Sequence, residues 1–310
     1  MQAWVSLNAA GGRPVSEDAE VLAARSGHNA DASATAASNN DDSALRVFRR
    51  IVAPDVFVRA GMCHAVSLDT ASTTWSRSGE PDTATEFCTF SIPAALSRAV
   101  PSRIRSYLAG RHCAARALAL AGSPETIDPL GAREWGAPRW PEDTVGSITH
   151  SARLAAAVVL PVAKARGVGI DAELLMDAAA AAEVAQRVLP EAASLGLRHT
   201  SVGPLSWPEF VTAVFSAKES IYKCLHPVCG VFFDFDAVHL VEIDPDAGAM
   251  RFRLTQSLGP SLEAGVLLTA HFRVGQEHVF SAVRLDSARV PVASSVSPPG
   301  TNVDRGASAD

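Results

Sequence analysis

The chain has 310 residues, of which 47% are hydrophobic, so it is long enough for one large or two small domains with a sizeable core. Its formal net charge of −6 argues against a dedicated nucleic-acid binder. No apolar run approaches the roughly 20 residues that a membrane helix needs, and the N-terminus lacks the basic and apolar regions of a signal peptide, so we expect a cytoplasmic protein.

The ordered part of the chain is expected to begin near residue 45. Residues 6–43 are rich in Ala, Ser, Asn, Asp and Gly and cannot bury enough apolar surface to offset their ordering entropy. A similar stretch of Ser, Pro, Gly and Asp begins near residue 290. We therefore expect disordered tails at 1–44 and 289–310 around one folded domain at 45–288.

Helix and strand patterns alternate through this domain. In chain order they predict a helix over 92–120 with a break near Pro101, strands over 145–149, 154–160 and 168–173, helices over 177–189 and 207–225, and strands over 232–241, 250–255, 266–274 and 278–285. Short turns join the last strands, so the expected fold class is α+β with antiparallel hairpins.

The cysteines argue against two common uses of this residue. There are five of them, an odd number with no CxxC pair: Cys63, Cys88, Cys113, Cys224 and Cys229. This pattern fits neither a disulfide framework nor a zinc site. They are expected to be reduced thiols, with Cys113 and Cys224 packed in the core.

The strand over 168–173 carries two acids on one face. Alternate strand residues share a face, so Gly169, Asp171 and Glu173 are expected to point away from the core. Gly169 leaves room beside the acids for a bulky group. Two carboxylates at this spacing repel each other unless a cation lies between them, and Mg²⁺ prefers such ligands and binds phosphates directly. An ordinary strand with a solvated acidic face is the alternative.

The helix over 207–225 carries charges beside a broad apolar arc, and Ser206 is expected to cap its first turn. At about 100° per residue Lys218 falls inside the arc, while Glu219 and Lys223 lie at its edge one turn apart. An i, i+4 ion pair worth about 0.2–0.5 kcal/mol would explain Glu219 and Lys223. It would leave Lys218 unexplained, whereas an anionic ligand along the helix would explain all three residues.

A basic segment precedes the acidic strand, with six arginines against three acidic residues. Arg103 and Arg111 lie about two helical turns apart on one face, and guanidinium groups bind phosphate through paired hydrogen bonds. His150 lies between two predicted strands, and its neighbours Ser147 and Thr149 offer hydroxyls suited to phosphate oxygens. A solvated helix face and a structural histidine are the alternatives.

Five motifs in chain order carry a resemblance to a known family. They are Gly110-Arg111-His112-Cys113-Ala114, Trp135-Gly136-Ala137-Pro138-Arg139-Trp140-Pro141, Ser147-Ile148-Thr149-His150-Ser151, Gly169-Ile170-Asp171-Ala172-Glu173 and Phe215-Ser216-Ala217-Lys218-Glu219-Ser220-Ile221-Tyr222-Lys223. The set resembles the 4′-phosphopantetheinyl transferases of the monomeric surfactin-synthetase and enterobactin-synthetase type, most of all their actinobacterial branch. This resemblance implies a pseudo-dimer of two similar α+β halves, about 45–165 and 166–288, with coenzyme A (CoA) in the cleft between them.

The resemblance also implies roles for the matching residues. Asp171, Glu173 and Glu219 would hold Mg²⁺ on the CoA pyrophosphate. Glu219 would also act as general base, and Lys223 would neutralise the pyrophosphate or protonate the leaving group. The expected CoA-binding residues are Arg103, Arg111, Arg133, Ser147, Thr149, His150, Lys218 and Lys223, with Arg139 as the alternative to Arg133.

The implied reaction is transfer of 4′-phosphopantetheine from CoA to a serine of an apo carrier protein, with release of adenosine 3′,5′-bisphosphate. The partner would be an acidic acyl or peptidyl carrier of a polyketide, nonribosomal peptide or fatty-acid synthase. It would dock near Leu225, Phe232 and Phe233, unless these residues pack in the core. Another Mg-dependent enzyme that cleaves CoA or a nucleotide-like anhydride is the main alternative. A non-catalytic CoA-binding or carrier-binding module is a further alternative, against which the acids and Lys223 argue.

Overall fold

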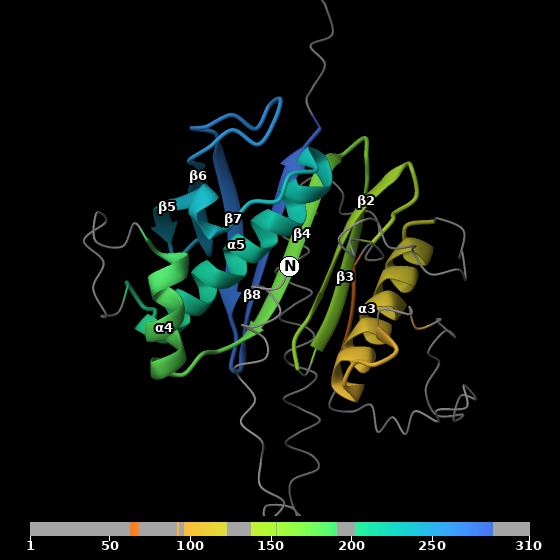
Figure 1. Cartoon of the computed structure of the whole chain (residues 1–310), viewed down its shortest axis with the longest axis horizontal. Coiled ribbons are helices and arrows are strands. Elements are labelled where there is room, and N and C mark those ends of the chain that lie inside the picture. The colour runs from red at the N-terminus through yellow and green to blue at the C-terminus, as the bar shows by residue number, and fades with distance from the viewer. Residues whose placement is uncertain are drawn as a thin grey trace, which may run out of the picture.

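The computed structural model describes residues 63–67, 92, 96–122, 138–152, 154–190 and 202–287. The expected tails at 1–44 and 289–310, and the candidate CoA ligand Arg133, lie outside these residues. The described elements form two antiparallel sheets with helices packed against them (Figure 1), which confirms the expected α+β fold class.

The first sheet has three strands in the order β1-β3-β2. Its strands are β1 (Cys63–Ser67), β2 (Thr144–His150) and β3 (Leu154–Pro161), and helix α3 (Pro101–Leu120) packs on it. Strand β3 is an almost unbroken apolar run because both of its faces are buried. One face of β3 (Ala155, Ala157 and Val159) contacts α3.

The second sheet has five strands in the order β4-β8-β7-β6-β5. Its strands are β4 (Ala165–Leu174), β5 (Val238–Asp244), β6 (Ala249–Leu254), β7 (Leu267–Val274) and β8 (His278–Asp286). The remaining elements are α4 (Ala178–Val188), α5 (Trp207–Cys229) and the 3-10 helix η5 (Phe235–Ala237). Helices α4 and α5 bury their apolar sides on one face of this sheet.

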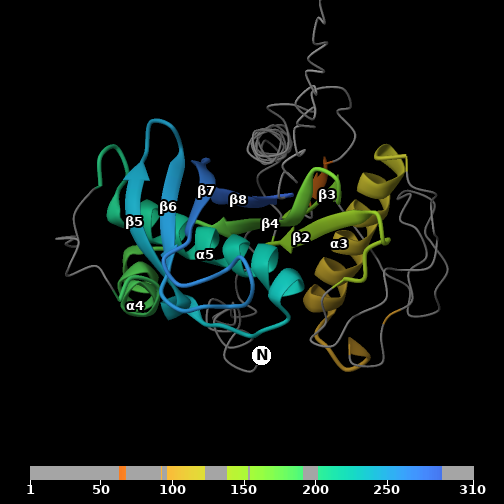
Figure 2. The same ribbon diagram turned by 90° about the horizontal axis from the view of Figure 1, so that it is seen from above.

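The two sheets pack on each other through β3 and β4. The other face of β3 forms a common core with β4 and β8 through Leu154, Ala156, Val158, Leu160, Val168, Ile170, Ala172, Phe280 and Ala282. Seen from above, β4 lies between the rest of its own sheet and the β2–β3 pair, and α3 lies beyond β3 (Figure 2). This confirms the predicted core face of β4 and leaves its other face, with the acids, toward α5.

Helix α5 begins as expected but ends later. Ser206 and Glu209 form a reciprocal capping box at its start. The predicted end at residue 225 is wrong, because Pro227 lies inside the last turn and the helix closes at Gly230, whose φ is 66°. A proline this close to the end removes a single hydrogen bond. None of the described helices has a stretch long and apolar enough to cross a lipid bilayer.

The helix predicted over 92–120 begins only at Pro101, because proline suits the first position of a helix. The remaining boundaries agree with the sequence to within a few residues, except at 232–241. That segment becomes strand only from Val238, because the Asp234 carboxylate accepts a hydrogen bond from the Phe235 amide at 2.7 Å and starts η5. Asparagine and aspartate favour such local turns over strand pairing. The segment from 231 to 234 is therefore a loop leading from α5 to the second sheet.

Candidate active site

Helix α5 rests directly on β4 at two glycines. A Cβ atom on Gly169 would lie 1.9 Å from the Ser220 carbonyl oxygen, and one on Gly167 would lie 2.5 Å from the Cys224 carbonyl oxygen. Only glycine permits this approach, because the facing atoms are helix backbone and cannot rotate aside. The bulky group expected beside Gly169 is therefore α5 itself, and its charged residues are brought over the acids of β4.

Asp171 lies at the centre of this contact. Its side chain is 3% exposed, and its Oδ1 accepts hydrogen bonds from Lys223 Nζ at 2.6 Å and from Thr149 Oγ1 at 3.2 Å. Its Oδ2 is buried and has no hydrogen-bond partner. Buried polar atoms nearly always have a partner, so this oxygen marks a position for a cation or for another donor.

Glu173 and Glu219 add negative charge around Asp171. Burial and the charge of Asp171 raise the pKa of Glu219 to about 8, while Lys223 acts in the opposite direction. Burial and Asp171 likewise raise the pKa of Glu173 well above its ordinary value. The charge of Asp171 therefore disfavours the ionised forms of Glu173 and Glu219, and a proton or a cation must compensate when the three acids share the site.

Lys223 supplies one compensating charge. Burial lowers the pKa of Lys223, but the charges of Asp171 and Glu219 and the hydrogen bond to Asp171 outweigh it, and the pKa lies above its ordinary value. The side chain is 28% exposed, so the ammonium group can meet a ligand while it pairs with Asp171. The ion pair joins Lys223 of α5 to Asp171 of β4, whereas the pair considered from the sequence joined Lys223 to Glu219 within the helix.

The donor set suits a divalent metal ion, although the acids are not drawn together around one point. Within the described part of the chain, no three carboxylate, imidazole or thiol side chains are gathered closely enough to hold an ion. Lys223 supplies the positive charge beside Asp171 instead. Even so, the unpartnered Asp171 Oδ2 and the mutual repulsion of the acids fit an added cation, and hard oxygen donors of this kind fit Mg²⁺.

Ser147 and Thr149 of β2 bind the free edge of β4, which is the outermost strand of its sheet. The Ile170 amide donates to Ser147 Oγ at 3.0 Å. The Ala172 amide donates to Thr149 Oγ1 at 3.1 Å. These two hydroxyls, which we expected to face phosphate oxygens, therefore satisfy backbone amides of β4 and link the two sheets.

His150 is the last residue of β2, and although part of the residue is exposed, protein surrounds its ring. The surrounding protein desolvates the ring, and this effect, followed by the charges of Lys223 and Arg103, lowers the pKa of His150, while Asp171 acts in the opposite direction. The imidazole is therefore neutral at pH 7 and has one N–H to donate. His150 at the end of β2 is therefore within electrostatic reach of Arg103 on α3, of Asp171 on β4 and of Lys223 on α5.

Arg111 is a buried cation on α3. It is 4% exposed, and its guanidinium carbon lies 5.1 Å from the centre of the Tyr107 ring. Its Nη1 is buried without a hydrogen-bond partner. Arg103, on the same predicted face, is exposed on the first turn of α3, as is Arg139 in the loop before β2. Among the described residues of α3, the unpartnered nitrogen of Arg111 is thus the strongest sign of an anion site.

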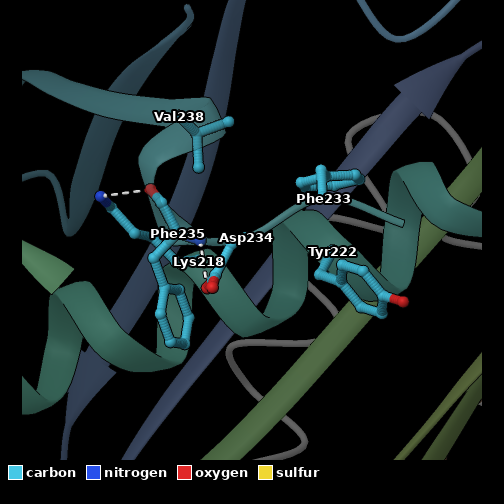
Figure 3. Close-up of a pocket in the computed structure, with 6 residues that line it drawn as sticks. All are labelled: Lys218, Tyr222, Phe233, Asp234, Phe235 and Val238. Carbon is cyan, nitrogen blue, oxygen red and sulfur yellow. Dashed lines mark hydrogen bonds between the residues drawn. The ribbon is translucent and has the colours of Figure 1, made fainter. Parts of the chain in front are cut away.

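Lys218 has a partner different from the anionic ligand considered from the sequence. It is 1% exposed, and its Nζ donates a hydrogen bond to the Phe235 carbonyl oxygen at 3.0 Å. Figure 3 shows it in the wall of a small pocket lined by Lys218, Tyr222, Phe233, Asp234, Phe235 and Val238. The amine therefore links η5 to α5.

Sequence reasoning missed a serine cluster between α5 and β8. Ser281 lies opposite Asp171 in the β4–β8 register. Its Oγ is 2.8 Å from the Oγ atoms of both Ser216 and Ser220. A serine within the apolar run from Val279 to Val283 was the available signal. This buried layer helps to fix the position of α5 over the acidic strand.

Two family models match the chain. Residues 92–160 match the 4′-phosphopantetheinyl transferase N-terminal domain, and residues 167–278 match the 4′-phosphopantetheinyl transferase superfamily. The first match contains α3, β2 and most of β3, and the second runs from β4 to the start of β8. The chain therefore belongs to the 4′-phosphopantetheinyl transferase family, in agreement with its motifs.

Three curated proteins are among the most similar relatives. The chain is 38% identical over 164 residues to 4′-phosphopantetheinyl transferase Svp of Streptomyces mobaraensis, covering 52% of this chain and 63% of the relative. It is 32% identical over 153 residues to 4′-phosphopantetheinyl transferase Npt of Nocardia iowensis, covering 47% and 62%. It is 33% identical over 163 residues to 4′-phosphopantetheinyl transferase PptT of Mycobacterium tuberculosis, covering 51% and 66%. The chain thus spans less than two thirds of each relative's length.

Proposed function

We propose that the protein transfers 4′-phosphopantetheine from CoA to a serine of an apo acyl or peptidyl carrier protein and releases adenosine 3′,5′-bisphosphate. Membership of the family and similarity to three named 4′-phosphopantetheinyl transferases support this reaction. The observation that carries it is Asp171, which has Lys223 on one carboxylate oxygen and no partner on the other.

The proposal includes an architecture. The catalytic domain would extend over 45–288 and act as a monomer, with two similar halves at about 45–165 and 166–288. CoA would bind between these halves. The contact between β2 and β4, together with the electrostatic coupling of His150 to Asp171 and Lys223, supports a site at this junction.

Residues of both halves would hold the phosphates of CoA. Arg111 offers a buried N–H without a partner, and Arg103 offers an exposed guanidinium nearby on α3. His150 would donate one neutral hydrogen bond. Lys223 would face the pyrophosphate from the second half. Arg133, or Arg139 in its place, would complete the set.

Glu219 would act as the general base. A carboxylate with a pKa of about 8 is poised near the operating pH, where acid–base catalysis is most efficient. It would take the proton of the carrier serine as the serine Oγ attacks the phosphorus that carries pantetheine. The bond from this phosphorus to the bridging oxygen then breaks, and adenosine 3′,5′-bisphosphate leaves with the electron pair, its charge met by Lys223.

Asp171, Glu173 and Glu219 would hold Mg²⁺, which when bound neutralises pyrophosphate charge and orients the leaving group. The reaction needs positioning and charge stabilisation more than covalent catalysis. The residues described above supply both, because they fix cationic groups of the first half and acids of the second on either side of one junction.

A product-coupling experiment tests the proposed reaction. The full-length protein is incubated with CoA and Mg²⁺, with and without an apo carrier, and nucleotide release and carrier mass are measured in the same samples. We expect one adenosine 3′,5′-bisphosphate for each carrier modified and none without carrier. Nucleotide release in the absence of carrier would instead favour an enzyme that hydrolyses CoA or a related anhydride.

A further inference from the structure

Thr149 has a position that no other residue of β2 shares. The residue is 1% exposed, and its hydroxyl lies between the edge of β4 and Lys223 of α5. Ser147, two residues earlier, contacts the same edge through the Ile170 amide. Of these two residues, only Thr149 also contacts the Asp171 carboxylate. Thr149 is bonded to the Ala172 amide, and Ala172 directly follows Asp171 in β4.

The hydrogen-bonding capacity of the Thr149 hydroxyl is completely used. A hydroxyl has one hydrogen to donate and two lone pairs to accept with. Oγ1 accepts from the Ala172 amide at 3.1 Å and lies 3.5 Å from the Lys223 ammonium, which donates to it. Since ammonium and amide groups can only donate, the single hydroxyl hydrogen is directed to Asp171 Oδ1 at 3.2 Å.

This arrangement makes the two carboxylate oxygens of Asp171 different. Oδ1 receives the Thr149 hydroxyl and the Lys223 ammonium, whereas Oδ2 receives nothing although it is buried. Rotation of the carboxylate about its Cβ–Cγ bond would exchange the two oxygens. Because the Ala172 amide is part of the strand, it fixes Thr149, and Thr149 in turn opposes that rotation.

We propose that Thr149 is a positioning residue that orients Asp171, so that Oδ1 is shared with Lys223 and Oδ2 remains open to a divalent cation. This inference rests on the proposed function only in taking Asp171 as a metal ligand. Hydrogen-bond partners of metal ligands typically change metal affinity by about 10- to 100-fold when they are removed. Thr149 therefore governs cation binding without contacting the cation.

The test compares three variants of the full-length protein. Thr149→Val keeps the β-branched shape and removes the hydroxyl, whereas Thr149→Ser keeps the hydroxyl. Thr212→Val is a matched control, because Thr212 is equally buried, accepts from the Met176 amide at 3.2 Å and donates to the Pro208 carbonyl at 2.7 Å. Mn²⁺ binding is measured in the presence of CoA by the electron paramagnetic resonance signal of the free ion, and folding by circular dichroism.

We expect Thr149→Val to weaken Mn²⁺ binding by about 10- to 100-fold, and Thr149→Ser and Thr212→Val to bind as the wild type does. Unchanged binding by Thr149→Val, weakened binding by Thr149→Ser, or no Mn²⁺ binding by the wild type would each overturn the inference. Equal weakening by Thr212→Val would show a general loss of stability and overturn it too. If Thr149→Val does not fold, Thr149→Ala takes its place with the same expectation.

The same samples separate this inference from the proposed function. Carrier modification by the wild type is measured beside Mn²⁺ binding. If the wild type binds Mn²⁺ and Thr149→Val does not, but no carrier is modified, the role of Thr149 stands and the proposed transfer fails. If the carrier is modified and Thr149→Val binds Mn²⁺ normally, the transfer stands and the role of Thr149 fails.

Discussion

Substitution of Gly169 by alanine tests whether the close approach of α5 to β4 builds the site. The new Cβ would lie 1.9 Å from the Ser220 carbonyl oxygen, whereas a close C···O contact is about 3.3 Å, so the helix must move by roughly 1.4 Å. Overpacking of this kind costs about 1–3 kcal/mol. Because the facing atom is backbone, we expect the upper part of this range.

The expected effects are large enough to measure separately. A loss of about 2–3 kcal/mol corresponds to a fall in Tm of roughly 4–12 °C for a domain of this size, which thermal unfolding followed by circular dichroism detects. A displacement of about 1 Å from reactive geometry can cost about 100-fold in rate. Such a loss would appear in single-turnover carrier modification below the Tm.

Gly110→Ala is the matched control for this substitution. Its Cβ would lie 2.8 Å from Ile148 Cγ2, so the half-buried Ile148 side chain must shift slightly. The atom it meets is not backbone, however, and alanine is favoured over glycine within a helix by about 1 kcal/mol. Its stability should therefore stay within about 1 kcal/mol of the wild type. If Gly169→Ala unfolds and turns over like the wild type, the contact between α5 and β4 does not have the role assigned to it.

Three further predictions follow from the buried groups. In the metal-free protein, stability to urea should fall as the pH rises from about 4.5 to about 8. The folded state keeps the Glu219 proton to about pH 8, whereas the unfolded state loses it near pH 4.5. Glu219→Gln should make this dependence less steep. Arg111→Met should weaken CoA binding about 10- to 100-fold in calorimetry, the effect of losing a hydrogen bond to a charged group, whereas the exposed Arg116→Met should not. In peptide mapping, iodoacetamide at pH 8 should modify Cys229 before Cys113 and Cys224. Cys113 and Cys224 are both buried, and burial raises the pKa of Cys224 to about 12.

The sequence predicted the elements that carry the site better than the contacts within it. Alternation along β4 and the capping residues of α5 are local signals, and both elements formed where these signals placed them. The sequence also indicated that Gly169 lies beside a bulky group. It could not show that this group is the backbone of α5, because the contact joins segments about 50 residues apart in the chain.

The polar side chains were harder to interpret for a related reason. Ser147 and Thr149 resemble phosphate ligands in a local motif, but the edge of β4 offers them backbone amides that only the tertiary fold reveals. Lys218 on an apolar arc indicated an unusual partner, and the structure provides the Phe235 carbonyl rather than an anion. In each case the residue was identified as unusual, while its partner depended on packing that no local pattern contains.

The most direct test of the proposed function is the intact mass of an apo carrier after incubation with the full-length protein, CoA and Mg²⁺. Polyketide, nonribosomal peptide and fatty-acid carriers are tested in parallel, with Asp171→Ala as the inactive comparison. We predict that at least one carrier gains the mass of one phosphopantetheine with the wild type and none with Asp171→Ala. No gain on any carrier, or an equal gain with Asp171→Ala, would contradict the proposal that this site performs the transfer.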